Sequence, residues 1–431
     1  MWHRQIEAKL FQFMEVLQKI LDNVIQETFN TKKIFIQIIT KKLNEIGIVL
    51  NKKQQHELEK KIKNTENFDD FSFQVDEKKA LECPSSLKDQ LNKLITIDPK
   101  DLENVCDKIS PKFEELIPKI ASEAAEIIFK TLKKNFKGFQ KYHRKNINAF
   151  NKNLDKVWGN PIDLLEMFYY IASEAGDAFN NQFRSLAAKE KNFVFDVLTR
   201  LHARSCQISA EIISLLKNGF ADGAHARWRT LHEIAVTAYF ITKHGNETAE
   251  RYICHEAIES YKAAIKYQEH CEVLGYQKLT EEELSEIKDE YDCFLKKYGT
   301  SFKNSYGWAS VAIGKDNPSF ADIEADVGLE YMRPYYKMAS HNVHANPKGV
   351  FFKLGLIPES GDVLLTGPSN LGLADPGHCT AISLLQITTN LLTFKPNLDR
   401  IVICYILSSL EKEIGEAFLH AECELKENMA T

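Results

Sequence analysis

Apolar residues recur at intervals of three and four positions through most of this 431-residue chain. The pattern runs through residues 6–49 and strengthens from Asn160 onward. This spacing places apolar side chains on one face of an α-helix. Consecutive helices with short connections are typical of an antiparallel bundle. We therefore predict a mainly α protein, an antiparallel helical bundle. The first apolar stripe contains Leu10, Met14, Leu17, Leu21 and Ile25.

Proline, asparagine and glycine mark the expected helix ends. Pro99 and Pro161 follow Asp98 and Asn160, and proline is favoured in a first helical turn. We expect helices to begin at both places. Asn218-Gly219 and Gly245-Asn246 predict helix ends, because glycine readily adopts the left-handed conformation that follows a helix. Later helices are expected over 193–216, 247–274, 280–298, 379–392 and 400–426.

One segment has a different pattern. Residues 349–357 and 363–366 are short apolar runs on either side of Pro358-Glu359-Ser360-Gly361-Asp362. Two such runs joined by a turn predict a β-hairpin. We expect a small β-hairpin insert near 349–367 in an otherwise helical protein.

Charge divides the chain unevenly. Residues 1–150 carry 27 Lys+Arg against 22 Asp+Glu, and the remainder carries 28 against 38. We predict a mildly basic helical region over 1–150, suited to dimerisation or to a protein partner, and a bundle domain over 151–431. Lysines and aromatic residues alternate within 130–145. That stretch fits phosphates or an acidic partner, or it is a solvated helix face whose Phe and Tyr side chains pack inward.

Composition excludes several classes of protein. No stretch approaches the roughly 20 apolar residues needed to cross a bilayer, so we expect no membrane partner. The first residues lack the apolar run of a secretory signal, which favours a cytoplasmic location. The nine cysteines form no Cys-x-x-Cys pair, which argues against a zinc ribbon and a disulfide framework. We find no phosphate-binding glycine loop, no Gly-x-Ser-x-Gly and no His-Glu-x-x-His, and we expect no cofactor.

The first of two polar clusters lies within a helical segment, at residues 226–233. Arg229 and Glu233 are four residues apart, so their side chains share a helix face and can pair. Arginine binds phosphate or carboxylate with two parallel hydrogen bonds. The cluster predicts an anion site, and the alternative is an ion pair that only fixes helix packing.

The second polar cluster, residues 335–344, contains two histidines. Ser340 and His344 are four residues apart, and His341 and His344 are three apart. A histidine exchanges protons near neutral pH and can act as a general base. Two histidines at this spacing can also hold a metal ion, with Glu233 or Asp326 adding an oxygen ligand. Pro347 disfavours helix at Asn346, so His344 should lie near a helix C-terminus. The alternative to a chemical role is that it only caps this helix.

Together these clusters resemble a bacterial family, the domain of unknown function 5677. Its pattern is Arg-x-x-x-Glu on one helix and a later Ser-x-x-Val-His, which Arg229, Glu233, Ser340 and His344 match. The resemblance covers roughly residues 160–400 and implies these site positions without implying an activity. A weaker resemblance is to HEPN-type helical bundles, many of which are metal-independent ribonucleases with four to six residues between an Arg and a following His. Arg227 and His232 have that spacing, although Trp228 replaces the usual polar residue.

We therefore predict a metal-independent endoribonuclease or nucleotide-directed phosphodiesterase of the bacterial antiphage defence or toxin type. Arg229 would bind phosphate and His344 would be the general base, with Glu233 and Ser340 completing the catalytic set. The expected partners are RNA or a nucleotide, and a second copy of the chain. The alternatives are a non-catalytic module for a small anion, a protein scaffold, and a metal-dependent hydrolase using His341 and His344. The predicted substrate-binding residues are Arg227, His232, His341, Tyr336 and Asn346.

Overall fold

The computed structural model describes residues 31–45, 49–64, 99–357 and 363–430. In these ranges the protein is helical and contains no β-strand, which confirms the predicted mainly α class. The chain divides into two compact units, residues 1–143 and 144–431. The boundary falls inside one long helix, α5 (Pro99–Lys189). The separate roles predicted for residues 1–150 and 151–431 stay predictions.

In the first unit, α2 (Thr31–Glu45) packs on α3 (Lys52–Asn64). Leu43, Leu50, Leu58 and Ile62 form a small buried cluster between them. Asn51 begins α3, because its side-chain oxygen accepts hydrogen bonds from the Lys53 and Gln54 amides. The predicted stripe from Leu10 to Ile25 lies outside the described residues.

Helix α5 begins at Pro99, as predicted, but Pro161 does not start a new helix. A proline inside a helix removes a hydrogen bond and crowds the preceding turn. Here the flanking residues Trp158, Ile162 and Leu165 are all buried in the core of the second unit. Burial of apolar side chains on both sides of the proline accounts for the continuous helix.

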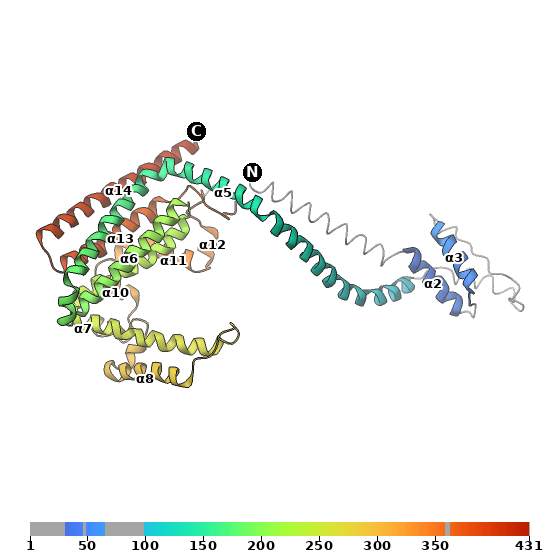
Figure 1. The fold of residues 1–431 in the computed structure, drawn as a ribbon, viewed down its shortest axis with the longest axis horizontal. Helices are drawn as coiled ribbons and strands as arrows, with labels where there is room; N and C mark the ends of the chain where they lie inside the picture. The colour runs from blue at the N-terminus through green and yellow to red at the C-terminus, as the bar shows by residue number, and fades with distance from the viewer. Residues whose placement is uncertain (1–30, 46–48, 65–98, 358–362, 431) are drawn as a thin grey trace, which may run out of the picture. The chain divides into compact units, whose positions relative to one another are not determined.

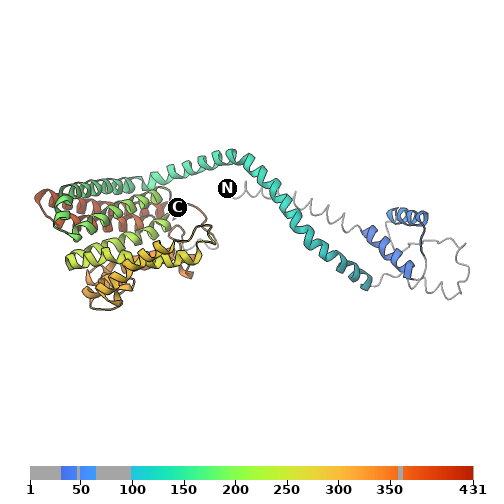
Figure 2. The ribbon, with the colours of Figure 1, turned by 60° about the horizontal axis from the view of Figure 1, so that its bottom comes forward.

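Four further helices form the bundle with the second part of α5. They are α6 (Phe193–Lys217), α7 (Ala221–His270), α13 (Ala374–Thr393) and α14 (Leu398–Ala430). Figures 1 and 2 show α6, α7, α13 and α14 running side by side, and one apolar core joins them. The predicted end at Asn218-Gly219 is present, whereas the end predicted at Gly245 is a break within α7, which continues to His270. Gly245 has φ 78°, a backbone conformation that glycine adopts far more readily than residues with a side chain. Helix α7 is kinked at this residue.

The segment between α7 and α13 is made of shorter elements and positions the candidate site. Helix α11 packs along α7, and α10 contacts α7 beside it. The elements are α8 (Glu281–Tyr298), η2 (Thr300–Lys303), η3 (Gly307–Ala309), α9 (Ser310–Ile313), α10 (Phe320–Asp326), η4 (Glu330–Met332), α11 (Arg333–Val343) and α12 (Pro347–Phe351).

The β-hairpin predicted near 349–367 is wrong for the residues described there. Residues 347–351 form the short helix α12, residues 363–366 form no regular element, and residues 358–362 are not described. Asn346 begins α12, since its side-chain oxygen accepts the Gly349 amide. Gly349 packs directly against the His341 carbonyl, where a side chain would not fit. This contact with α11 favours a helical turn over an extended strand.

No helix among the described residues is both long and apolar enough to span a bilayer.

Candidate functional site

Arg229 and Glu233 form an ion pair on one face of α7. Arg229 Nε lies 3.0 Å from Glu233 Oε1, and the two side chains are 23% and 32% exposed. The expected pairing across one helical turn is therefore present. Partial burial alone would lower the pKa of Arg229, but hydrogen bonding to Tyr336 and the charge of Glu233 outweigh it and raise that pKa. Arg229 is thus a permanently charged group at a half-buried position.

Tyr336 of α11 completes the contact between the two helices. Its hydroxyl donates a 2.6 Å hydrogen bond to Glu233 Oε1, and the Arg229 guanidinium lies 4.9 Å from the centre of its ring. Burial and the hydrogen bond to Glu233 raise the pKa of Tyr336. The hydroxyl therefore stays protonated and acts as a donor. Glu233 receives two hydrogen bonds on one oxygen, which orients the arginine beside it.

His344 is the residue that brings the second polar cluster to Arg229. It caps the C-terminus of α11, with its backbone amide donating to the Ser340 carbonyl, as the prediction of a helix end required. Its Nε2 lies 3.4 Å from Arg229 Nη1, and the side chain is exposed. A guanidinium only donates, so Nε2 is the acceptor in this long hydrogen bond. We call Arg229, Glu233, Tyr336 and His344 the outer cluster.

Arg227 is not brought to the outer cluster. It forms an ion pair with Glu211 of α6. Residues two positions apart on a helix point to nearly opposite sides, so Arg227 and Arg229 contact different neighbouring helices. The structure thus separates two arginines that the sequence places side by side.

His232 is the neighbour of Glu233 in the sequence, but its side chain is fully buried. Its Nε2 is 2.8 Å from Glu324 Oε1, and both side chains are 0% exposed. Arg333 forms an ion pair with the other oxygen of Glu324. We call these three residues the inner network. Sequence reasoning did not single out Glu324 or Arg333, because nothing in their local pattern distinguishes them from surface charges. Arg333-Pro334 at the start of α11 was the one available signal.

The inner network is enclosed by aromatic rings. Trp228 stacks on His232 at 5.5 Å, and Tyr336 lies 5.9 Å from it. The other face of Trp228 stacks on His225, a fully buried histidine whose ring nitrogens have no hydrogen-bond partner. Burial lowers the pKa of His225 to about 4. Tyr336, a member of the outer cluster, therefore contacts both groups, since the guanidinium groups of Arg229 and Arg333 also lie over its ring.

The other predicted residues of the second cluster hold local structure. Ser340 Oγ donates 2.7 Å to the Tyr336 carbonyl in its own helix. Asn346 Nδ2 lies 2.6 Å from His341 Nδ1 and donates to it, while the Asn346 side-chain oxygen caps α12. Asp326, considered as a metal ligand, pairs with Lys243 and His244. Within the residues that the structure describes, no three His, Cys, Asp or Glu side chains are grouped to hold a metal ion.

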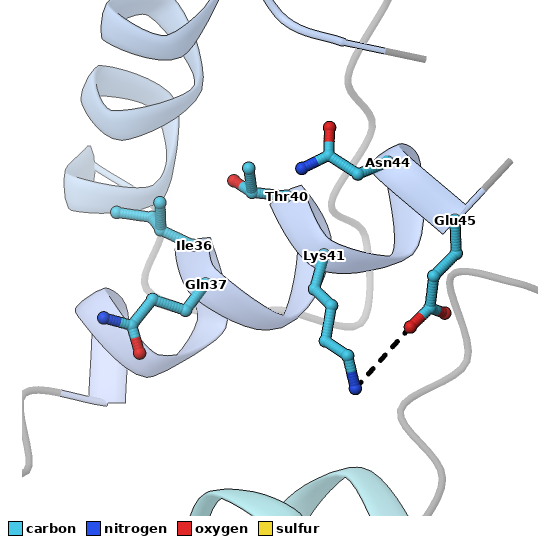
Figure 3. A pocket seen from close by; sticks show the side chains of 6 residues that line it. All are labelled: Ile36, Gln37, Thr40, Lys41, Asn44 and Glu45. Carbon is cyan, nitrogen blue, oxygen red and sulfur yellow. Dashed lines mark ion pairs between the residues drawn. The ribbon is translucent and has the colours of Figure 1, made fainter. Parts of the chain in front are cut away.

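Two surface hollows lie elsewhere. One follows α2, where Figure 3 shows the lining side chains and the 3.5 Å ion pair between Lys41 and Glu45. The other, of about 400 Å³, is lined by residues of α7, α13 and α14, among them Tyr239, Gln386 and Tyr405. None of the predicted site residues lines either hollow.

Comparison with known proteins supports the family resemblance over part of the chain. Residues 195–357 match the model of a family of unknown function (DUF5677). The match includes α6 and α7 and ends after α12, so it contains both the outer cluster and the inner network. No curated protein and no solved structure matches the chain.

Proposed function

We propose that the outer cluster binds and cleaves an RNA phosphodiester without a metal ion. The observation that carries the proposal is the 3.4 Å separation of Arg229 Nη1 and His344 Nε2, contributed by different helices. Metal-independent RNA cleavage needs a cation at the phosphate and a base at the attacking hydroxyl. These two groups meet here at a half-buried and accessible position.

In the proposed reaction, Arg229 binds a non-bridging phosphate oxygen and His344 Nε2 turns from the arginine to the ribose. Nε2 takes the proton of the 2′-hydroxyl as its oxygen attacks phosphorus. The bond from phosphorus to the 5′-oxygen breaks, and that oxygen takes a proton from solvent. The products are a 2′,3′-cyclic phosphate and a free 5′-hydroxyl. Arg229 stabilises the negative charge that builds up on phosphorus oxygens in the transition state.

Glu233 and Tyr336 act as positioning residues in this proposal. Glu233 holds Arg229 through Nε, which leaves the far end of the guanidinium directed at His344. The Tyr336 hydroxyl donates a hydrogen bond to Glu233 and so stabilises its negative charge. The carboxylate is therefore engaged on the side of the arginine away from the proposed phosphate position.

The test is cleavage of short RNA oligonucleotides by purified protein in the presence of a chelator. We expect loss of about 10²-fold or more for His344→Ala and for Arg229→Ala. Lys337→Ala, an exposed change on the same helix, is the matched control and should leave the rate unchanged. A substrate with deoxyribose at the cleaved position should be inert. Cleavage that persists in His344→Ala, or on the deoxyribose substrate, would contradict the mechanism.

A second candidate is binding of a small anion without turnover. It is favoured by the hydrogen bond that Arg229 Nη1 donates to His344 Nε2, because a base already engaged by a cation is a weak proton acceptor. Thermal shift measurements with phosphate and nucleotides distinguish the two functions. An anion that stabilises wild-type protein but not Arg229→Ala, in protein that cleaves no RNA, would favour this second function.

The resemblance to HEPN-type bundles extends the proposal to a cytoplasmic bacterial defence protein that acts as a homodimer. It rests on motif spacing alone. Sedimentation of the full chain tests the dimer, since a monomer at the concentration of the cleavage assay would contradict it. Elemental analysis of the active protein tests the alternative of a metal-dependent hydrolase using His341 and His344.

A further inference from the structure

Helix α5 presents an exposed apolar face in the first unit. Phe129, Leu132, Phe136 and Phe139 are 56%, 53%, 55% and 45% exposed. Their spacing of three, four and three residues places them in one row along the helix. The sequence left open whether the aromatic residues of this stretch pack inward. These side chains do not, so the row is available to a partner.

The opposite face of the same segment is basic. Lys130, Lys134, Lys137 and Lys141 are exposed and repeat at the same three- and four-residue spacing. Each lies two positions from a residue of the apolar row, which places it on nearly the other side of the helix. No aspartate or glutamate occurs from residue 127 to residue 154. The segment is therefore a basic amphipathic helix, with one lysine, Lys133, beside the apolar row.

We propose that residues 129–141 of α5 dock on the surface of an anionic lipid bilayer. An interfacial helix places Phe and Leu side chains among the acyl chains and keeps lysines on the polar side, where they attract acidic headgroups. Lysine stems can also lie along the apolar face and extend their charge outward, and Lys133 Nζ already lies 4.3 Å from the Phe129 ring. This is surface binding, so it departs from our expectation of no membrane partner, which considered only spanning.

The separation of the faces decides against other partners. A single RNA strand stacked on the phenylalanines could reach Lys133 but not the four lysines of the opposite face. A second copy paired along this row would cover the apolar side chains but leave both lysine faces directed outward, with no acidic residue in the segment to offset their charge. A bilayer satisfies both faces, since its apolar interior and its charged surface act on one helix simultaneously.

The experiment is co-sedimentation of the full chain with vesicles of phosphatidylcholine alone or mixed with phosphatidylserine. We expect binding to the mixed vesicles, weakened about tenfold or more at high salt, because surface charges are screened. Phe136→Glu with Phe139→Glu should abolish binding. Lys134→Glu with Lys137→Glu should weaken it about tenfold or more, whereas Lys134→Arg with Lys137→Arg, the matched control, should retain it.

Several results would overturn the proposal. Equal binding to neutral and anionic vesicles would remove the role of the lysines. No binding of the wild type to the mixed vesicles would show that the row does not dock on an anionic bilayer. Displacement from vesicles by single-stranded RNA, or a dimer that dissociates in Phe136→Glu with Phe139→Glu, would assign the face to RNA or to a second copy. RNA cleavage should be unchanged in these variants, so this test is independent of the proposed function.

Discussion

The outer cluster and the inner network meet on α7, where Glu233 and His232 are adjacent residues, and they differ in burial more than in chemistry. Each contains an arginine, a glutamate and a histidine. In the inner network, Glu324 and His232 are 0% exposed, whereas Glu233 in the outer cluster is 32% exposed. A buried carboxylate must be paired, because burying an unpaired charge costs several kcal/mol. The same residue types therefore serve packing inside and remain accessible to a ligand outside.

The largest expected effect separates the two groups by stability. Glu324→Ala leaves Arg333 and His232 without their buried partner and should lower the free energy of unfolding by about 3–5 kcal/mol. Glu233→Ala, the matched change in the outer cluster, should cost about 1 kcal/mol or less, since its ion pair is partly solvated. Urea unfolding of both variants measures the difference. Equal losses would erase the distinction between inner and outer residues.

The next largest expected effect is that acid destabilises the bundle, through two buried histidines. The pKa of His225 and that of buried His202 fall from 6.5 to about 4 through desolvation. Between these pH values the unfolded chain binds protons that the folded protein does not, so stability is full above about pH 6.5 and falls toward pH 4. Each histidine should contribute about 2 kcal/mol of loss at pH 5.

Measuring the free energy of unfolding from pH 7 to pH 5 tests this prediction, and the His225→Phe variant isolates the contribution of His225. Phenylalanine keeps a ring against Trp228 and cannot be protonated. The loss between the two pH values should shrink by about half, since His202 remains. An unchanged pH dependence would show that His225 does not change its protonation state when the protein unfolds.

A smaller effect tests the link between the helices. Tyr336→Phe removes the hydroxyl that donates to Glu233 and should cost about 1–2 kcal/mol. It should also slow RNA cleavage by loosening Arg229. Tyr335→Phe is the matched control, because Tyr335 is 38% exposed and it is the hydroxyl of Tyr336 that donates to Glu233. If both variants behave alike, Tyr336 does not position the outer cluster.

The smallest expected effect concerns Ser340, predicted from the sequence to belong to the catalytic set. Its hydroxyl donates to a carbonyl of its own helix, a local contact of little net energy. Ser340→Ala should change the free energy of unfolding by about 0.5 kcal/mol or less and cleavage by about threefold or less. A loss of cleavage comparable to that of His344→Ala would instead assign the hydroxyl a role in binding the substrate.

Much of the helical fold could be predicted, because periodicity and end signals are local. The end at Asn218-Gly219 and the break at Gly245 both follow from the conformational freedom of glycine. The hairpin prediction failed because a short apolar run such as Val350–Phe352 carries no period that separates strand from helix. Asn346-Pro347, which ended one helix in our prediction, also starts the next.

The candidate site could be predicted in part. Arg229 and Glu233 are neighbours within one helix, and the position of His344 at a helix end follows from Pro347. The burial of His232 could not be predicted, because its partner Glu324 is 92 residues away on another helix. Arg227 likewise pairs across helices, with Glu211.

The sequence by itself determined where the helices run, which arginine and glutamate share a face, and where the histidine ends its helix, since these depend on contacts three or four residues apart. Only the tertiary structure decided that Arg229 and His344 meet, that His232 is enclosed, and that the phenylalanines of α5 are exposed. Each of these depends on which helices pack together, and the energy of that packing is summed over core residues distant in sequence.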